Sequence, residues 1–178
     1  MEMEFKNKKT LLNQSKITVL IIIFLLYLGN YAFVPYLTIY FHEQFHLPLP
    51  IIAAAFSIQL FSQRGLAFLG GIVTDKKGGK LSMLIGITLC IIAYLTFFAA
   101  YNAPTLIIAS FLNGLGLSFF SPSSKVILFE MTHGEERTKM LFFRNMMMNV
   151  GIAVGPCLGL IALPLIGKFL MLGIALLY

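Results

Sequence analysis

The sequence predicts an all-α integral membrane protein with six membrane-crossing helices, the last of them incomplete. Three observations carry this prediction: the composition, the length of the apolar runs and the placement of the basic residues. Of the 178 residues, 58% are hydrophobic and 11% are charged, and the mean hydropathy is +0.88. Soluble domains have about 45–50% apolar and about 25% charged residues. The composition therefore excludes an ordinary soluble domain.

The apolar runs give the expected order of the helices. A bilayer core about 30 Å thick requires about 20 helical residues, and five runs reach that length. The first is too long for the apolar region of a signal peptide and is expected to remain as a helix. The sixth run ends at Tyr178 after about 18 Å of helix, so we expect the chain to be one piece of a longer protein. The expected spans are 17–41, 51–73, 81–101, 105–129, 140–163 and, incomplete, 167–178.

The basic residues predict the orientation of these spans, because lysine and arginine are retained on the cytoplasmic side during insertion. With residues 1–16 as a cytoplasmic tail, the outer loops hold only Lys168. We expect a cell membrane location, in the inner or plasma membrane of a bacterium. The net charge of +6 is then a topology signal and an attraction to lipid headgroups, and no nucleic-acid partner is expected. The basic residues on the cytoplasmic side are Lys6, Lys8, Lys9, Lys16, Lys76, Lys77, Lys80, Lys125, Arg137 and Lys139.

The second and third spans are joined by a short charged segment, residues 71–80. Its glycines permit a tight reversal of the chain, and its lysines hold the turn in the cytosol. A simple basic hairpin that fixes topology is the alternative interpretation. The residues that form the pattern are Gly71, Asp75, Lys76, Gly78 and Lys80.

This spacing resembles the cytoplasmic signature loop of the major facilitator superfamily, at the expected place between the second and third helices. It departs from that loop at Gly79, where the family usually has a basic residue. The resemblance implies that Asp75 and this loop latch the cytoplasmic side of a transporter. Pro35 in the first span, and Asn113 with Pro122 in the fourth, are also similar to the family's first and fourth helices. Ser110 stands where its multidrug-resistance branch often has an arginine.

The fifth span contains a run of small residues with a proline. Gly151, Gly155 and Gly159 remove side chains from one helix face, so another helix can approach closely, and Pro156 weakens the local hydrogen bonding. The run resembles the Gly-x-x-x-Gly-Pro-x-x-Gly element of drug:proton antiporters, with Leu160 at its last expected glycine. It is expected either as a seam on which two halves rock or as a packing seam without a transport role.

Taken together, these matches imply an N-terminal six-helix half of a major facilitator superfamily fold, with a truncated sixth helix. The resemblance to the multidrug-resistance branch implies export of amphipathic, drug-like small molecules by alternating access. The expected partners are the lipid bilayer, a small-molecule substrate and the missing C-terminal six-helix half, without which we expect no transport. A non-transporting membrane subunit, or the product of an interrupted gene, is the alternative.

Polar residues inside the spans are the candidate cavity residues. Arg64 and Arg144 each need a partner, a water-filled cavity or a route to the interface. We expect them to line the cavity or the interface between halves, and to pair with acids of the second half or with substrate; snorkelling to the headgroups is the alternative. The other candidates, which can equally bond to a neighbouring helix, are Tyr27, Asn30, Tyr31, Gln59, Gln63, Asn113, Asn145 and Asn149.

No enzyme, metal or cofactor is expected. Residues 42–46 fit the His-Glu-x-x-His pattern of zinc proteases, but Pro48 and Pro50 follow at once and no third ligand lies on the outer side. A membrane metalloprotease is therefore a remote alternative. No aspartate or glutamate lies in a span core, so an acid that couples transport to protons would belong to the absent half.

Overall fold

The structure is a computed structural model that describes the backbone of residues 2–178 and the side chains of residues 14–178. The side chains of Lys6, Lys8 and Lys9, expected on the cytoplasmic side, lie outside the described residues. Within the described range every regular element is helical, which confirms the all-α prediction. The elements are α1 (Glu2–Phe33), the 3₁₀ turn η1 (Val34–Tyr36), α2 (Leu37–Phe45), α3 (Leu49–Gly65), α4 (Ala67–Lys77), α5 (Gly79–Ala99), α6 (Ala103–Glu130), α7 (Glu135–Ile166) and α8 (Phe169–Leu177).

Five stretches of this chain are long and apolar enough to cross a membrane, and they follow the order of the five complete predicted spans. Two of them are interrupted. The first bends at η1, where Pro35 has no backbone N–H to donate, and the second is broken at Leu66 between α3 and α4. Because α1 begins at Glu2, the segment expected as a cytoplasmic tail continues the first helix. The stretches are Gln14–Phe45, Leu49–Lys77, Gly79–Ala99, Ala103–Glu130 and Glu135–Ile166.

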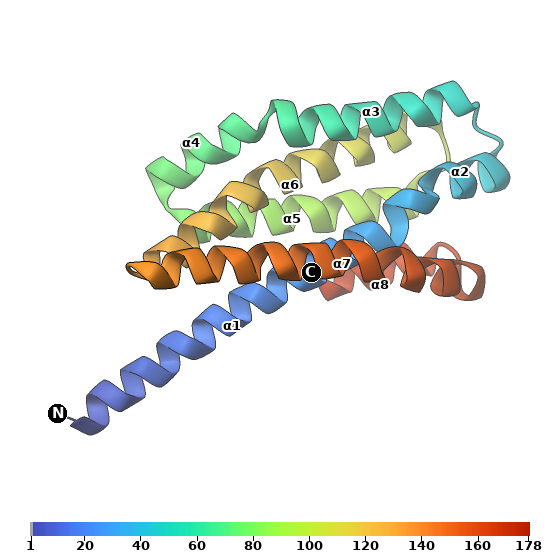
Figure 1. Cartoon of the computed structure of the whole chain (residues 1–178). Helices are drawn as coiled ribbons and strands as arrows, with labels where there is room; N and C mark the ends of the chain where they lie inside the picture. Colours follow the sequence, from blue (N-terminus) through green and yellow to red (C-terminus); the bar gives the residue numbers. More distant parts are fainter. Residues whose placement is uncertain (1) are drawn as a thin grey trace.

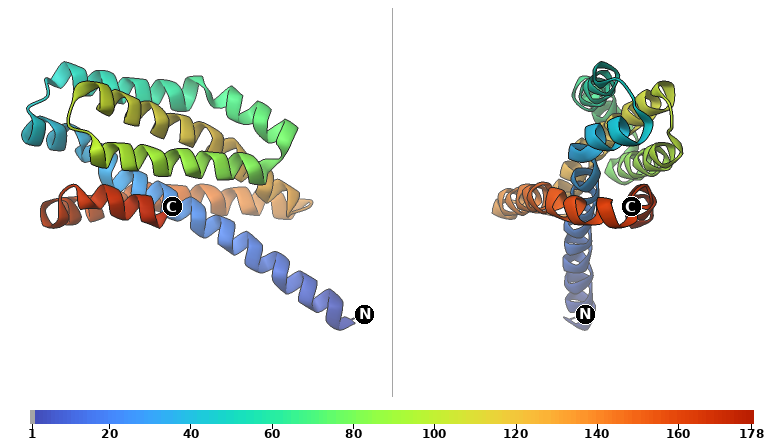
Figure 2. Two further views of the ribbon diagram at one scale, coloured as in Figure 1. Left: turned by 180° about the vertical axis from the view of Figure 1, so that it is seen from behind. Right: turned by 90° about the vertical axis from the view of Figure 1, so that its right-hand side faces the viewer.

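The helices form an up-and-down bundle (Figure 1). The connections α4–α5 and α6–α7 lie at one end, together with the start of α1, and the connections α2–α3, α5–α6 and α7–α8 lie at the other. Helix α6 packs against α3, α4 and α5, whereas α7 packs mainly against α1. The end view in Figure 2 shows α7 and α8 on opposite sides of α1. Helix α8 packs mainly against α5 and less against α1, so it connects the group around α6 with the pair formed by α1 and α7.

Helix α6 is held between two neighbours by glycines on its opposite faces. A Cβ atom on Gly114 would overlap Ser62 Oγ and the backbone carbonyl of Gln59 in α3. A Cβ on Gly116 would lie 2.8 Å from the carbonyl oxygen of Gly86 in α5. Since both approaches are of backbone to backbone, neither neighbour can move aside without moving its whole helix.

Candidate functional site

A cavity of about 670 Å³ opens between α1, α3, α4, α6 and α7 in the half of the bundle that holds the α4–α5 and α6–α7 connections. We call it the basic cavity. Its wall combines apolar side chains, such as Ile152 and Met148, with polar ones. Ligand pockets of about 300–1,000 Å³ with a few convergent polar groups are typical of small-molecule sites. The expected cavity residues that line it are Tyr27, Tyr31, Gln63, Arg64, Arg144 and Asn145.

Arg144 is the most constrained of these residues, with a side chain only 2% exposed. Its Nε donates to Ser124 Oγ at 3.0 Å, and its Nη2 donates to the carbonyl oxygen of Ser121 at 3.1 Å. Its Nη1 donates to Asn145 Oδ1, also at 3.1 Å. These neutral acceptors fix the plane of the guanidinium, but they do not neutralise its charge.

Two further cations lie on the wall of the basic cavity. Arg64 comes from α3 and Lys125 from α6, and both are exposed. Lys125 was expected only as a cytoplasmic charge, although it lies four residues after Ser121 and therefore shares its helix face. No aspartate or glutamate is among the described residues that line this cavity. The charged side chains among the described residues of its wall are therefore all cationic.

Three of the candidate residues lie between helices, away from the basic cavity. Tyr94 donates its hydroxyl hydrogen to Asn30 Oδ1 at 3.2 Å, and Asn113 Nδ2 donates to the same oxygen at 2.8 Å. This network joins α1, α5 and α6. Gln59 is buried on the face of α3 that packs against α6. A sequence cannot distinguish such a buried bond from cavity lining, because both place a polar residue inside a span.

Asn149, the last of the candidate cavity residues, does not line the basic cavity. With Asn145 and Val150 it borders a shallow hollow of about 400 Å³ on α7. Because every residue of this hollow comes from α7, it is a feature of one uncovered helix face and not a site between helices.

The charged segment at residues 71–80 is a tight reversal, as its glycines suggest. Helix α4 ends at Lys77, Gly78 has a φ of +87°, and α5 begins at Gly79. A Cβ on Gly79 would lie 2.7 Å from the Ile127 side chain of α6, so a larger residue would push α5 and α6 apart.

The remaining residues of this segment face outward or open space. Asp75, Lys76 and Lys80 are exposed, and within the described part of the chain Asp75 takes part in no ion pair. A Cβ on Gly71 would meet nothing within 4 Å. The turn is held instead by Thr74, which donates to Ser82 Oγ at 2.9 Å.

The glycines of α7 pack against α1 of the same chain. A Cβ on Gly155 would lie 2.9 Å from the carbonyl oxygen of Leu28, and one on Gly159 would overlap the carbonyl of Ala32. Gly151 lies against α1 in the same way, and Tyr36 donates its hydroxyl hydrogen to the carbonyl oxygen of Pro156 at 2.8 Å. In this chain the close approach of the glycine face is therefore made to α1.

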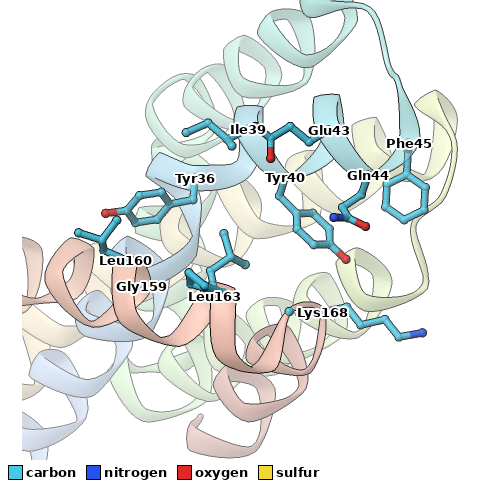
Figure 3. Close-up of a pocket in the computed structure, with 12 residues that line it drawn as sticks. Tyr36, Ile39, Tyr40, Glu43, Gln44, Phe45, Gly159, Leu160, Leu163 and Lys168 are labelled. Atoms are coloured by element: carbon cyan, nitrogen blue, oxygen red, sulfur yellow. The ribbon is translucent and has the colours of Figure 1, made fainter.

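A second cavity, of about 700 Å³, lies between α2 and the end of α7 at the opposite end of the bundle (Figure 3). We call it the aromatic cavity, because Tyr36, Tyr40 and Phe45 line it together with Glu43. Figure 3 shows Tyr40 directed into the space between the two helices, and Lys168 pointing away from it. The sequence did not single out these rings, which follow one another on the bent first span.

The His-Glu-x-x-His pattern does not lie on one helix. Helix α2 ends at Phe45, and His46 has a left-handed φ of 52°. His42 Nδ1 lies 3.0 Å from the carbonyl oxygen of Leu47. Zinc proteases need both histidines on one helix face, and no group of three His, Cys, Asp or Glu side chains suited to a metal occurs in the described part of the chain.

Comparisons with known proteins agree with this architecture. The family model of the Major Facilitator Superfamily matches residues 19–177. An uncharacterized MFS-type transporter of Bacillus subtilis, YqjV, is 38% identical over 112 residues, which are 62% of this chain and 26% of that protein. The multidrug resistance protein MdtH of Salmonella typhimurium is 26% identical over 147 residues, 83% of this chain and 37% of MdtH. The chain thus spans about a quarter to just over a third of the length of these relatives.

Proposed function

Because the chain belongs to the Major Facilitator Superfamily, we propose that it is the N-terminal six-helix half of a transporter that exports amphipathic small molecules. It is a multi-pass membrane protein, and its family consists of transporters. In the proposed mechanism a C-terminal six-helix half faces this one, and substrate binds between them near the middle of the membrane. Rocking of the halves exposes the site to each side in turn.

The basic cavity is the observation that carries this proposal. Four of the five membrane-length stretches contribute to its wall, which contains both apolar and hydrogen-bonding side chains. An amphipathic molecule needs both kinds of surface in one site. The cavity lies along α1 and α7, and the aromatic cavity lies further along the same part of the bundle. The two cavities therefore lie along one helix pair, toward its opposite ends.

The name of MdtH supports export of more than one compound. MdtH is a multidrug resistance protein, and the alignment with it covers most of this chain. We propose that the chain shares this class of substrate and that its N-terminus lies in the cytoplasm of a bacterial cell. In this orientation Asp75 is exposed at the cytoplasmic end, free to latch onto the second half.

The test is a chimera in which this chain replaces the corresponding N-terminal part of MdtH. It is expressed in cells without their own drug pumps, and accumulation of a fluorescent amphiphile is measured with and without an uncoupler. We expect energy-dependent export by the chimera and none by the 178-residue chain alone. Export by the chain alone would show that no second half is needed. A chimera that reaches the membrane at the level of MdtH but leaves accumulation unchanged would contradict the transport proposal.

A further inference from the structure

The charge of the basic cavity points to a property of its ligand. Arg64, Lys125 and Arg144 reach it from three different spans. The only ion pair in the described part of the chain joins Lys16 and Glu136, so none of the three has a carboxylate partner there. We propose that the basic cavity binds amphiphiles that carry a carboxylate, with the acid group at Arg144 and the apolar body along α6 and α7. This inference rests on the proposed transport function and adds the charge of the substrate.

The energetic argument begins with the burial of Arg144. A charge inside a membrane protein is costly unless it is paired or solvated. The neutral oxygens of Ser121, Ser124 and Asn145 orient the guanidinium, whereas only an anion offsets its charge. Nε, Nη1 and Nη2 each already donate to one of these residues, so a carboxylate binds through the second N–H of each Nη atom, in two parallel hydrogen bonds. A ligand that brings a carboxylate to this place therefore gains more than one that brings a neutral amide.

The other two cations of the basic cavity, Arg64 and Lys125, also favour a ligand with a negative charge. Arg64 and Lys125 are exposed on the wall of the cavity, where they attract an anion as it enters. An organic cation would meet three positive charges and no acid among the residues of this wall. Like charges repel most strongly where solvent does not screen them, as at the buried Arg144, so this half alone favours anionic over cationic ligands.

The uncharged part of the cavity wall suits the apolar body of such a ligand. Leu117, Met148 and Ile152 provide apolar surface, and methionine adapts to ligands of different shape. Gln63 and Tyr31 add hydrogen-bonding groups that do not select a charge. The volume of the cavity, about 670 Å³, lies within the range of pockets that bind drug-sized ligands. The fixed anion site at Arg144 therefore selects ligands by their charge, and the adaptable apolar wall accepts ligands of different shape.

The experiment measures binding to the purified 178-residue chain in nanodiscs of phosphatidylcholine. The probes are 11-(dansylamino)undecanoate and a dansyl-undecyl trimethylammonium of the same chain length. We expect the carboxylate probe to bind at least about tenfold more tightly than the cation. Arg144→Gln and the triple change with Arg64→Gln and Lys125→Gln should each raise the Kd of the carboxylate probe by about tenfold or more.

The control is Lys139→Gln, which removes an exposed positive charge of α7 that does not line the cavity. It should leave both Kd values within about twofold. Circular dichroism and size-exclusion elution of each variant establish that it is folded. Arg144→Lys serves where Arg144→Gln does not fold, because it keeps the charge but loses the two-point geometry. We expect this change to weaken binding of the carboxylate probe selectively.

Three results would overturn the proposal. These are equal affinity for the two probes, a carboxylate affinity that the triple change leaves intact, and competition by phosphatidylglycerol at ordinary membrane fractions. Either of the first two results would indicate that Arg64, Lys125 and Arg144 pair with acidic residues of the second half. Competition by phosphatidylglycerol would indicate that they bind a lipid headgroup. The chimera experiment reads out export independently. Charge-selective binding without export would therefore contradict only the transport proposal, and export without charge selection would contradict only this inference.

Discussion

Helices α6 and α7 are similar in length and composition but differ in how the bundle uses them. They have 28 and 32 residues, and both contain internal prolines, one in α6 and two in α7. Half of the most apolar window of α6 is buried, against 17% of that of α7. Since both are apolar enough to cross a membrane, hydropathy does not separate them. The difference lies in the number of neighbours, and it makes α6 the scaffold and α7 the surface that remains open to lipid or to a partner.

The polar residues of the two helices follow the same division. Ser110 and Asn113 of α6 are buried against other helices, whereas Asn145 and Asn149 of α7 are exposed. Arg144 is the exception on α7, because it turns toward α6 and bonds to Ser121 and Ser124. Arg144 thus ties the open helix to the scaffold at the wall of the basic cavity.

The largest expected effect tests whether α6 is the scaffold. Gly114→Leu would drive a side chain into the backbone of α3, which is itself held by its own packing. Overpacking of this kind costs about 1–3 kcal/mol or more, and we expect little folded protein after solubilisation. The measurement is the fraction that elutes as a single species after heating. Gly173→Leu is the control, since a Cβ there meets nothing within 4 Å. Equal recovery of the two variants would refute the scaffold role of α6.

A smaller effect is expected for the corresponding glycine of α7. Gly155→Leu places its side chain against Leu28 and Tyr31 of α1. Because the opposite face of α7 has few neighbours, the helix can move outward and relieve part of the overlap. We expect a lower melting temperature than that of the unmodified chain but a higher one than that of Gly114→Leu. The reverse order would show that α7 is as rigidly held as α6.

The third prediction concerns the buried network on α6. Asn113→Leu removes the hydrogen bond to Asn30 and should lower the free energy of unfolding by about 0.6 kcal/mol and by no more than about 1.7 kcal/mol, the average and the maximum for such bonds between membrane helices. Titration with sodium dodecyl sulfate, followed by circular dichroism, measures it. The same substitution at Asn149, which is exposed on α7, is the matched control and should change the stability little. A loss at Asn149 that equals the loss at Asn113 would remove the distinction between the two helices.

The sequence predicted the number and order of the complete spans because span length and charge in the loops are local properties. It also identified the two arginines of the basic cavity, since a charge inside a span needs a special environment. It could not separate Asn30 and Asn113, which bond to each other, from Asn145, which lines the cavity. That distinction depends on which helices are neighbours. For the same reason the sequence did not show that the glycines of α7 pack against α1.

The smallest effect concerns the ion pair that anchors the start of α7 to α1. Lys16 Nζ lies 2.5 Å from Glu136 Oε1; the lysine side chain is buried, at 6% exposed, whereas the glutamate side chain is 45% exposed and leaves the pair open to solvent on one side. Ion pairs of this exposure contribute about 0.2–1 kcal/mol and are screened by salt. Glu136→Gln should therefore lower the stability by less than about 1 kcal/mol at low salt, and by a negligible amount at high salt.

Glu135→Gln is the control for this pair, because it removes the same charge from the preceding residue, which has no ion pair in the described part of the chain. A double variant with Lys16→Gln isolates the interaction between the two side chains. If Glu136→Gln cost as much as Asn113→Leu and the cost persisted in high salt, the pair would act as a buried contact. The start of α7 would then be fixed as firmly as α6, and the open character of α7 would be confined to its later turns.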